Sequence, residues 1–106
     1  MVKEIDVTEL SQWRNEGRAF VLLDVREPDE VASASIPDSQ HIPMREIPQR
    51  LGELPRELPI AVMCHHGGRS ERVAHFLAAQ GFANVANVDG GIDAYAREID
   101  STIPRY

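Results

Sequence analysis

Short apolar runs alternate with segments of helical period along the 106 residues of this chain. Three of these runs, at 20–23, 60–63 and 85–88, have the length of buried strands and carry β-branched residues. Strands that alternate with helices predict βαβ units, in which the strands pair in parallel. We therefore expect an α/β fold with a mainly parallel central sheet, flanked by short helices on both of its faces.

The first two expected helices are short. Thr8 is a candidate N-cap for a helix whose apolar face carries Leu10 and Trp13, and Gly17 is expected to end it. Further along, Pro28 begins a second segment with an acidic first turn, which is typical of a helix N-terminus.

The second half of the chain predicts one longer helix and one short helix. From Ser70 onward the apolar residues fall on one helical face, and Gly81 is expected to end this helix. A final short helix is expected around Ile92 and Tyr95. Prolines punctuate the middle third of the chain, which can therefore hold only short elements.

The length and composition fit one globular domain. At 106 residues the chain corresponds to a single domain, 1–106, with no room for a second. Hydrophobic residues make up 42% and charged residues 26% of the chain, which excludes the disordered classes. We expect the domain to fold on its own and to act as a monomer.

The charge pattern excludes a phosphate-backbone partner. The net charge is -6 and the basic residues are scattered, whereas nucleic-acid-binding proteins gather lysine and arginine on one face. No apolar stretch has the length of a membrane span or of a signal peptide. We therefore expect a cytoplasmic protein with no nucleic-acid or membrane partner.

The segment CHHGGRS contains the single cysteine of the chain. Cys64 follows the expected strand at 60–63, and Gly67 and Gly68 allow a tight turn before the helix that starts near Ser70. The thiol thus lies where a strand ends and a helix begins, which is where ligands bind in open α/β sheets. A lone cysteine is either a small buried hydrophobe or a reactive thiol, and this arrangement favours a nucleophile.

A nucleophilic Cys64 needs a lowered pKa. An unperturbed thiol has a pKa of about 8.5, so half-ionisation at neutral pH requires a shift of ~1.5 units, or roughly 2 kcal/mol. A helix N-terminus supplies only about 0.3–1 kcal/mol. The amides of the loop are therefore expected to contribute most of the shift, and Arg69 is a candidate for a further contribution.

Four segments together resemble the rhodanese-like sulfurtransferases. CHHGGRS resembles the active-site loop of that family, and LLDVREPDE at 22–30 resembles its upstream signature. HIPM at 41–44 matches the segment before the middle helix, and VDGGIDAY at 88–95 resembles the C-terminal signature, with Tyr95 where tryptophan is usual. The segment ASIPDS at 34–39 lacks the glycines and the histidine of the usual GHIPGA pattern.

The resemblance implies a sulfurtransferase that works through a persulfide on Cys64. A small donor, thiosulfate or a persulfide, gives its outer sulfur to the thiolate, and cyanide or a thiol acceptor then takes it, with no cofactor and no metal. The alternative is a binding module that relays a persulfide between protein partners with little small-molecule turnover. The C-x4-R spacing from Cys64 to Arg69 is the family's length for sulfur transfer, whereas related phosphatases use a loop longer by one residue.

The two histidines of the loop leave two interpretations open. His65 and His66 are either solvated loop side chains or a source of positive potential and proton transfer beside the thiolate. A metal site built from Cys64, His65 and His66 is not expected, because consecutive residues cannot all turn toward one ion.

Four charged residues are candidates for supporting the loop or binding a donor. Arg69 lies in the first helical turn, where a cation opposes the helix dipole, so it is expected to have an acidic partner or an anionic ligand. Asp24 and Glu30 are the candidate partners, and the resemblance favours a bracing role. Arg26 is expected either to bind an anionic donor such as thiosulfate or to form a surface salt bridge.

Overall fold

The computed structural model describes residues 2–106 and is built around a five-stranded sheet with the order β1-β5-β4-β2-β3. Every strand pair in this described part is parallel. The strands are β1 (Val2–Ile5), β2 (Val21–Asp24), β3 (Gln40–His41), β4 (Ile60–Met63) and β5 (Val85–Val88). The expected α/β fold with a parallel sheet is confirmed.

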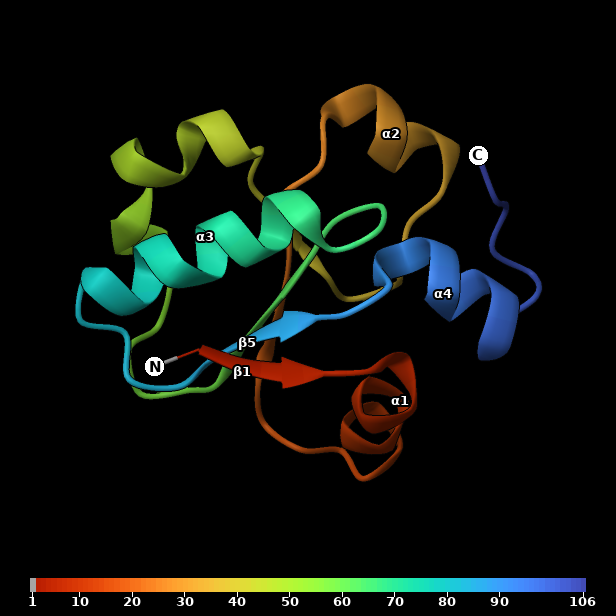
Figure 1. The fold of residues 1–106 in the computed structure, drawn as a ribbon, viewed down its shortest axis with the longest axis horizontal. Helices are drawn as coiled ribbons and strands as arrows, with labels where there is room; N and C mark the ends of the chain where they lie inside the picture. Colours follow the sequence, from red (N-terminus) through yellow and green to blue (C-terminus); the bar gives the residue numbers. More distant parts are fainter. Residues whose placement is uncertain (1) are drawn as a thin grey trace.

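Helices cover both faces of this sheet, as the sequence pattern predicts. The α-helices are α1 (Val7–Asn15), α2 (Pro28–Ser33), α3 (Gly68–Ala79) and α4 (Gly91–Glu98), and two 3-10 helices are η1 (Met44–Gln49) and η2 (Leu51–Glu53). Figure 1 shows α1 on one side of β1 and β5, and α3 with the 3-10 helices on the other. No helix in residues 2–106 is long and apolar enough to cross a bilayer.

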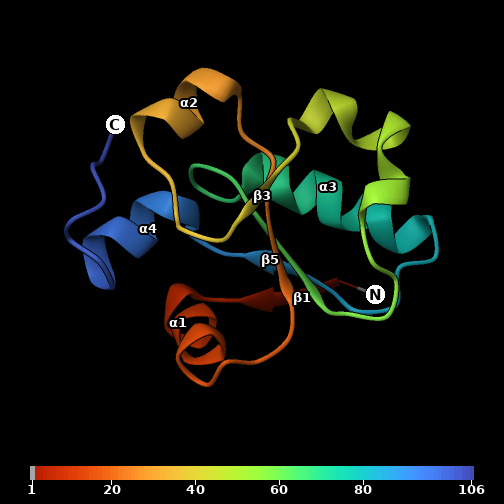
Figure 2. The same cartoon turned by 180° about the vertical axis from the view of Figure 1, so that it is seen from behind.

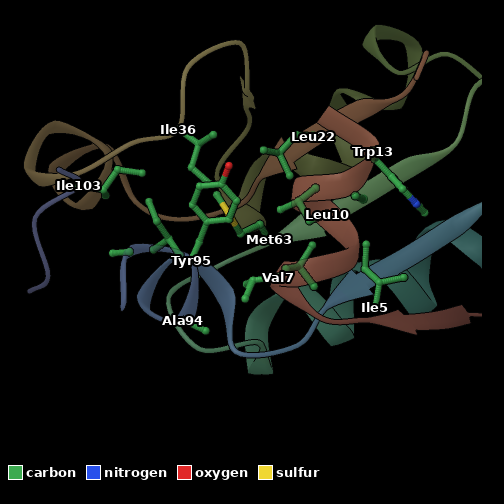
Figure 3. Packing of buried hydrophobic residues seen from close by; sticks show 14 of the residues in the cluster. Ile5, Val7, Leu10, Trp13, Leu22, Ile36, Met63, Ala94, Tyr95 and Ile103 are labelled. Atoms are coloured by element: carbon green, nitrogen blue, oxygen red, sulfur yellow. The ribbon is translucent and has the colours of Figure 1, made fainter. Parts of the chain in front are cut away.

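The core consists of two apolar layers separated by the sheet. Along β4, Ala61 and Met63 face the layer that contains α1 and α4, whereas Ile60 and Val62 face the layer that contains α3. Figure 3 shows Met63 meeting Tyr95 of α4 in the first of these layers. Because β4 is buried on both faces, its position in the fold is fixed by packing from both sides.

The structure corrects several boundaries. Asp6, not Thr8, caps α1, because its carboxylate accepts a hydrogen bond from the Glu9 amide at 2.9 Å. Strand β1 was not predicted, since the exposed polar pair Lys3 and Glu4 interrupts its apolar pattern. Helix α3 begins at Gly68, two residues before the expected start.

Candidate active site

Cys64 directly follows the central strand of the sheet. Strand β4 ends at Met63, and its neighbours β2 and β5 lie on either side of it. Figure 1 shows the chain then curling into a loop before it enters α3. The Cys64 side chain is almost fully buried, with 1% relative exposure. The sulfur therefore lies beneath the loop at the C-terminal edge of the sheet, where the strand pattern predicted it.

Two glycines allow the loop to take its path. Gly67 has φ 119°, a left-handed conformation that side chains rarely adopt. Gly91, at the start of α4, lies so close to the loop that a Cβ atom there would come within 2.4 Å of the carbonyl oxygens of Cys64 and His65. The first turn of α4 also donates to the loop, from the Ile92 amide to the Cys64 carbonyl at 2.9 Å. Hydrogen bonds from the first turn of α4 thus fix the backbone of the loop.

Hydrogen-bond donors converge on the sulfur. The Gly67 amide lies 3.1 Å from Cys64 Sγ, and the amide and hydroxyl of Ser70 each lie 3.4 Å from it. Burial raises the pKa of the Cys64 thiol, but the Ser70 hydroxyl and the loop amides outweigh this effect, so the pKa lies below its ordinary value. These donors therefore stabilise the thiolate form of Cys64.

Arg69 is bound by Glu30 of α2. Its two terminal nitrogens donate to the two Glu30 carboxylate oxygens at 2.6 and 2.9 Å. This bidentate pair, more than any other interaction, lowers the pKa of Glu30 to about 2. Of the two candidate partners left open by the sequence, the structure selects Glu30 and not Asp24. Arg69 therefore ties the Cys64 loop to α2.

Arg26 forms a salt bridge, as one of its two interpretations held, but the pair with Asp24 is buried and does not lie on the surface. Its side chain is fully buried, and its five N–H groups all have partners. They donate to the carboxylate of Asp24, at 2.7 Å for the shortest bond, to the carbonyls of Glu30 and Ala34, and to the hydroxyl of Tyr106. Arg26 therefore has no N–H left for a donor molecule, and it joins the end of β2 to α2 and the C-terminal tail.

The C-terminal tail contacts the same end of the sheet. Figure 2 shows the tail running along the outer side of the molecule, from the end of α4 to the side of α2. The Tyr106 hydroxyl accepts a hydrogen bond from Arg26 at 2.8 Å and donates one to Glu30 at 3.0 Å. Its ring stacks on His65, with a centroid separation of 4.1 Å and an angle of 10°. Tyr106 thus adds a second support to Glu30 and packs against the loop.

The loop histidines differ in their surroundings. His66 is exposed, which agrees with a solvated side chain, whereas His65 is half-buried between Tyr106 and His66. Burial, followed by the nearby His66, lowers the pKa of His65, which favours the neutral imidazole. This direction weakens the interpretation of His65 as a source of positive potential beside the thiolate.

One group of metal-ligand side chains occurs beside the loop. Ligand atoms of His65, His66 and Asp93 lie within 4.8 Å of one another, and Cys64 is not among them. Both Asp93 oxygens already accept hydrogen bonds from Arg105, and Arg97 donates a third. A carboxylate held by two guanidinium groups is a poor ligand for a divalent cation, so we assign no metal to this group.

Sequence reasoning missed three contributors to the site. Asn87 of β5 accepts a hydrogen bond from the Ser70 hydroxyl, and the signal was a polar residue within an otherwise apolar strand. Gly91 and the first amides of α4 lie within the segment VDGGIDAY, but their contact with the loop depends on the tertiary fold. Tyr106 gave no signal, because a terminal tyrosine has no local pattern around it.

Comparison with known proteins identifies similar sequences. A family model described as "Rhodanese-like domain" matches residues 6–98. The chain is 40% identical over 97 residues to a protein named Sulfurtransferase from Allochromatium vinosum, with 92% of this chain and 91% of that protein covered. It is 37% identical over 93 residues to the thiosulfate sulfurtransferase GlpE of Pseudomonas syringae, with coverages of 88% and 86%.

A longer relative and a solved structure extend the comparison. The putative sulfur carrier protein YrkF of Bacillus subtilis is 37% identical over 91 residues, which cover 86% of this chain and only 49% of that protein. The crystal structure of a rhodanese-like domain protein from Staphylococcus aureus matches with a TM-score of 0.85 and 31% identity, and 98% of each chain is covered. The similarity thus extends over sequence and fold alike.

Proposed function

The chain belongs to the rhodanese-like domain family of sulfurtransferases, and from this premise we propose that it moves sulfane sulfur from thiosulfate to a thiol or cyanide through a persulfide on Cys64. The observation that carries the proposal is the set of donors around the buried sulfur, from the Gly67 amide and from Ser70. The name of the relative from Pseudomonas syringae supports thiosulfate as the donor.

The proposed reaction is a double displacement. The Cys64 thiolate attacks the outer sulfur of thiosulfate, the sulfur–sulfur bond of the donor breaks, and sulfite leaves with the bonding electron pair. The nucleophilic acceptor, a thiolate or cyanide, then attacks the outer sulfur of the persulfide, and the Cys64 thiolate is restored. Every step moves one sulfur atom and one electron pair, so this chemistry needs no external oxidant.

The surroundings of Arg69 favour sulfur transfer over phosphoryl transfer. A phosphoryl group carries several charged oxygens and is bound best by an arginine that offers both terminal nitrogens. Those two nitrogens of Arg69 already donate to Glu30. The loop instead directs single amides at the sulfur, which suits a compact anion such as a thiolate or a persulfide.

A second candidate function is a persulfide carrier. It is favoured by the similarity to the putative sulfur carrier protein YrkF, of which the chain covers about half. In this role Cys64 would receive sulfur from one protein and pass it to another, with the same persulfide chemistry. The two functions differ in whether thiosulfate and cyanide support repeated turnover.

The test is the steady-state formation of thiocyanate from thiosulfate and cyanide. The proposed function predicts sustained turnover that depends on enzyme concentration and is absent in Cys64→Ser, with the melting temperature of the variant near that of the wild type. A carrier would load sulfur once and show no turnover. Equal turnover in Cys64→Ser would contradict both functions, because a hydroxyl cannot form a persulfide.

The proposal includes a cellular setting. The single thiol of the chain stays available as a nucleophile in a reducing compartment, so we place the protein in the cytoplasm. We further propose that it acts as a monomer, and the sulfur transfer described above needs no cofactor. Cell fractionation and light scattering of the purified protein test these two points.

A further inference from the structure

A row of polar side chains runs from the active-site sulfur to the far edge of the sheet. The Ser70 hydroxyl lies 2.6 Å from Asn87 Oδ1, and Asn87 Nδ2 lies 3.0 Å from a Glu4 carboxylate oxygen. Ser70 and Asn87 are buried, with exposures of 0% and 3%, whereas Glu4 is exposed. The parallel register of β1 and β5 places Glu4 beside Asn87. This row links the sulfur to a surface carboxylate.

The Ser70 hydroxyl has one hydrogen and three acceptors within reach. Asn87 Oδ1 is at 2.6 Å, the Gly67 carbonyl is at 3.1 Å, and Cys64 Sγ is at 3.4 Å. A hydroxyl donates only one hydrogen bond, so these acceptors compete for it. The amide oxygen of Asn87 is the closest of the three and also the stronger acceptor compared with a thiol sulfur. Asn87 therefore competes with the sulfur for the Ser70 hydrogen.

Glu4 determines which end of the Asn87 amide faces Ser70. An ionised carboxylate only accepts hydrogen bonds, so it attracts the NH2 group of Asn87 and leaves Oδ1 toward the hydroxyl. In the opposite orientation the NH2 group would donate to Ser70 Oγ, and the hydroxyl hydrogen would be free to turn to the sulfur. The Glu4 carboxylate thus favours the orientation in which Asn87 Oδ1 accepts the hydrogen bond from Ser70.

We propose that Asn87 and Glu4 are positioning residues that hold the Ser70 hydroxyl away from Cys64 while the sulfur is neutral, and that release it when the sulfur becomes a thiolate. The inference rests on the proposed role of Cys64 as the nucleophile. When the charge forms on Sγ, the hydroxyl turns to it, because a hydrogen bond to an anion is stronger than one to a neutral amide. In the persulfide the charge moves to the outer sulfur, and the hydroxyl returns to Asn87.

The charged and titratable groups near Cys64 lie on elements other than β1 and β5. Substitutions at Glu4 and Asn87 therefore leave these groups in place. Arg69 of α3 is paired with Glu30 of α2, and the half-buried His65 and exposed His66 belong to the loop. Glu4 of β1 is connected to the sulfur through Asn87 and Ser70. In this proposal, a substitution at Glu4 or Asn87 changes the Cys64 pKa through the Ser70 hydroxyl.

The test measures the pH dependence of iodoacetamide alkylation of Cys64 in Asn87→Ala and Glu4→Lys. Removing the competing oxygen, or attracting it toward a cation at position 4, frees the hydroxyl to donate to the sulfur. We expect the apparent pKa of Cys64 to fall by roughly half a unit in each variant, which is about threefold more thiolate at pH 6. Glu4→Lys changes an exposed side chain and keeps the test valid if Asn87→Ala does not fold.

The matched control repeats both changes in the Ser70→Ala background. Without the hydroxyl, neither change should move the pKa of Cys64, whereas a general effect of charge or loosened packing would persist. The proposal would be overturned if either change left the Cys64 pKa unchanged or raised it in the protein that retains Ser70. It would also be overturned if the pKa fell equally with and without the Ser70 hydroxyl. Alkylation needs no sulfur donor, so a failure of sulfur transfer in the wild type would count against the proposed function and leave this measurement intact.

Discussion

The guanidinium of Arg69 forms a bidentate ion pair with the carboxylate of Glu30, and this pair joins the Cys64 loop to α2. Because the guanidinium engages Glu30, we expect Arg69→Ala to loosen the loop: the free energy of unfolding should fall by about 1–3 kcal/mol. The sulfur-transfer rate should fall with it, while the Cys64 pKa moves little. Melting curves and alkylation profiles measure both quantities.

The control for this change is Arg72→Ala, an exposed arginine on the same helix, which should leave stability and rate nearly unchanged. The alternative, direct electrostatic stabilisation of the thiolate by Arg69, gives the opposite pattern. It would raise the Cys64 pKa and leave the melting temperature of Arg69→Ala at the wild-type value.

The same pair predicts a specific acid dependence of stability. The pKa of Glu30 is about 2 in the folded protein, against an ordinary value of 4.5. A carboxyl with a lowered pKa contributes its stabilisation in full above pH 4.5 and loses it as the pH falls toward 2, because the unfolded chain takes up the proton first. Urea unfolding of the wild type and Glu30→Gln should therefore show a stability difference that narrows over this window. A difference that stays constant down to pH 2 would rule out this account of the pair.

Gly91 is predicted to be intolerant of a side chain. A methyl group there would meet the carbonyl oxygens of Cys64 and His65 at 2.4 Å, and the residue has φ 58°. We expect Gly91→Ala to cost about 1–3 kcal/mol of stability and to reduce sulfur transfer, because the loop must move. Gly52→Ala is the matched control, since open space surrounds that glycine, and it should be close to neutral. Equal stability of the two variants in chemical denaturation would show that α4 does not constrain the loop.

The buried pair of Arg26 and Asp24 predicts a strongly non-additive response. Arg26→Met leaves the Asp24 carboxylate buried without its partner, which typically costs about 3–5 kcal/mol. Asp24→Leu together with Arg26→Met removes both charges, so we expect the double variant to be more stable than the sum of the single changes implies. Chemical denaturation of the two single variants, Arg26→Met and Asp24→Leu, and of the double variant gives the coupling energy. Additive effects of the two changes would contradict a coupled buried pair.

The parts of the site that depend on local pattern were predictable from the sequence. The apolar run at 60–63, the two glycines after Cys64 and the helical period beyond them are all short-range signals. They placed the thiol at the end of a buried strand, and the structure agrees. The parallel sheet followed from the same alternation of strands and helices.

The rest depends on contacts between distant segments. The sequence could not choose between Asp24 and Glu30 as the partner of Arg69, because both lie near the end of β2 and only packing of α2 decides. Arg26 looked like a surface residue because the tail that encloses it, including Tyr106, is 80 residues away along the chain. Strand β1 was missed because it lies at the edge of the sheet, where the exposed polar residues Lys3 and Glu4 interrupt its apolar pattern.

In the proposed function, Cys64 carries the transferred sulfur as a persulfide. The most direct measurement is the intact mass of the protein after incubation with thiosulfate, before and after treatment with a reductant. We expect the wild type to gain one sulfur atom, the reductant to remove it, and Cys64→Ser to gain none. No gain in the wild type, or the same gain in Cys64→Ser, would contradict this role of Cys64.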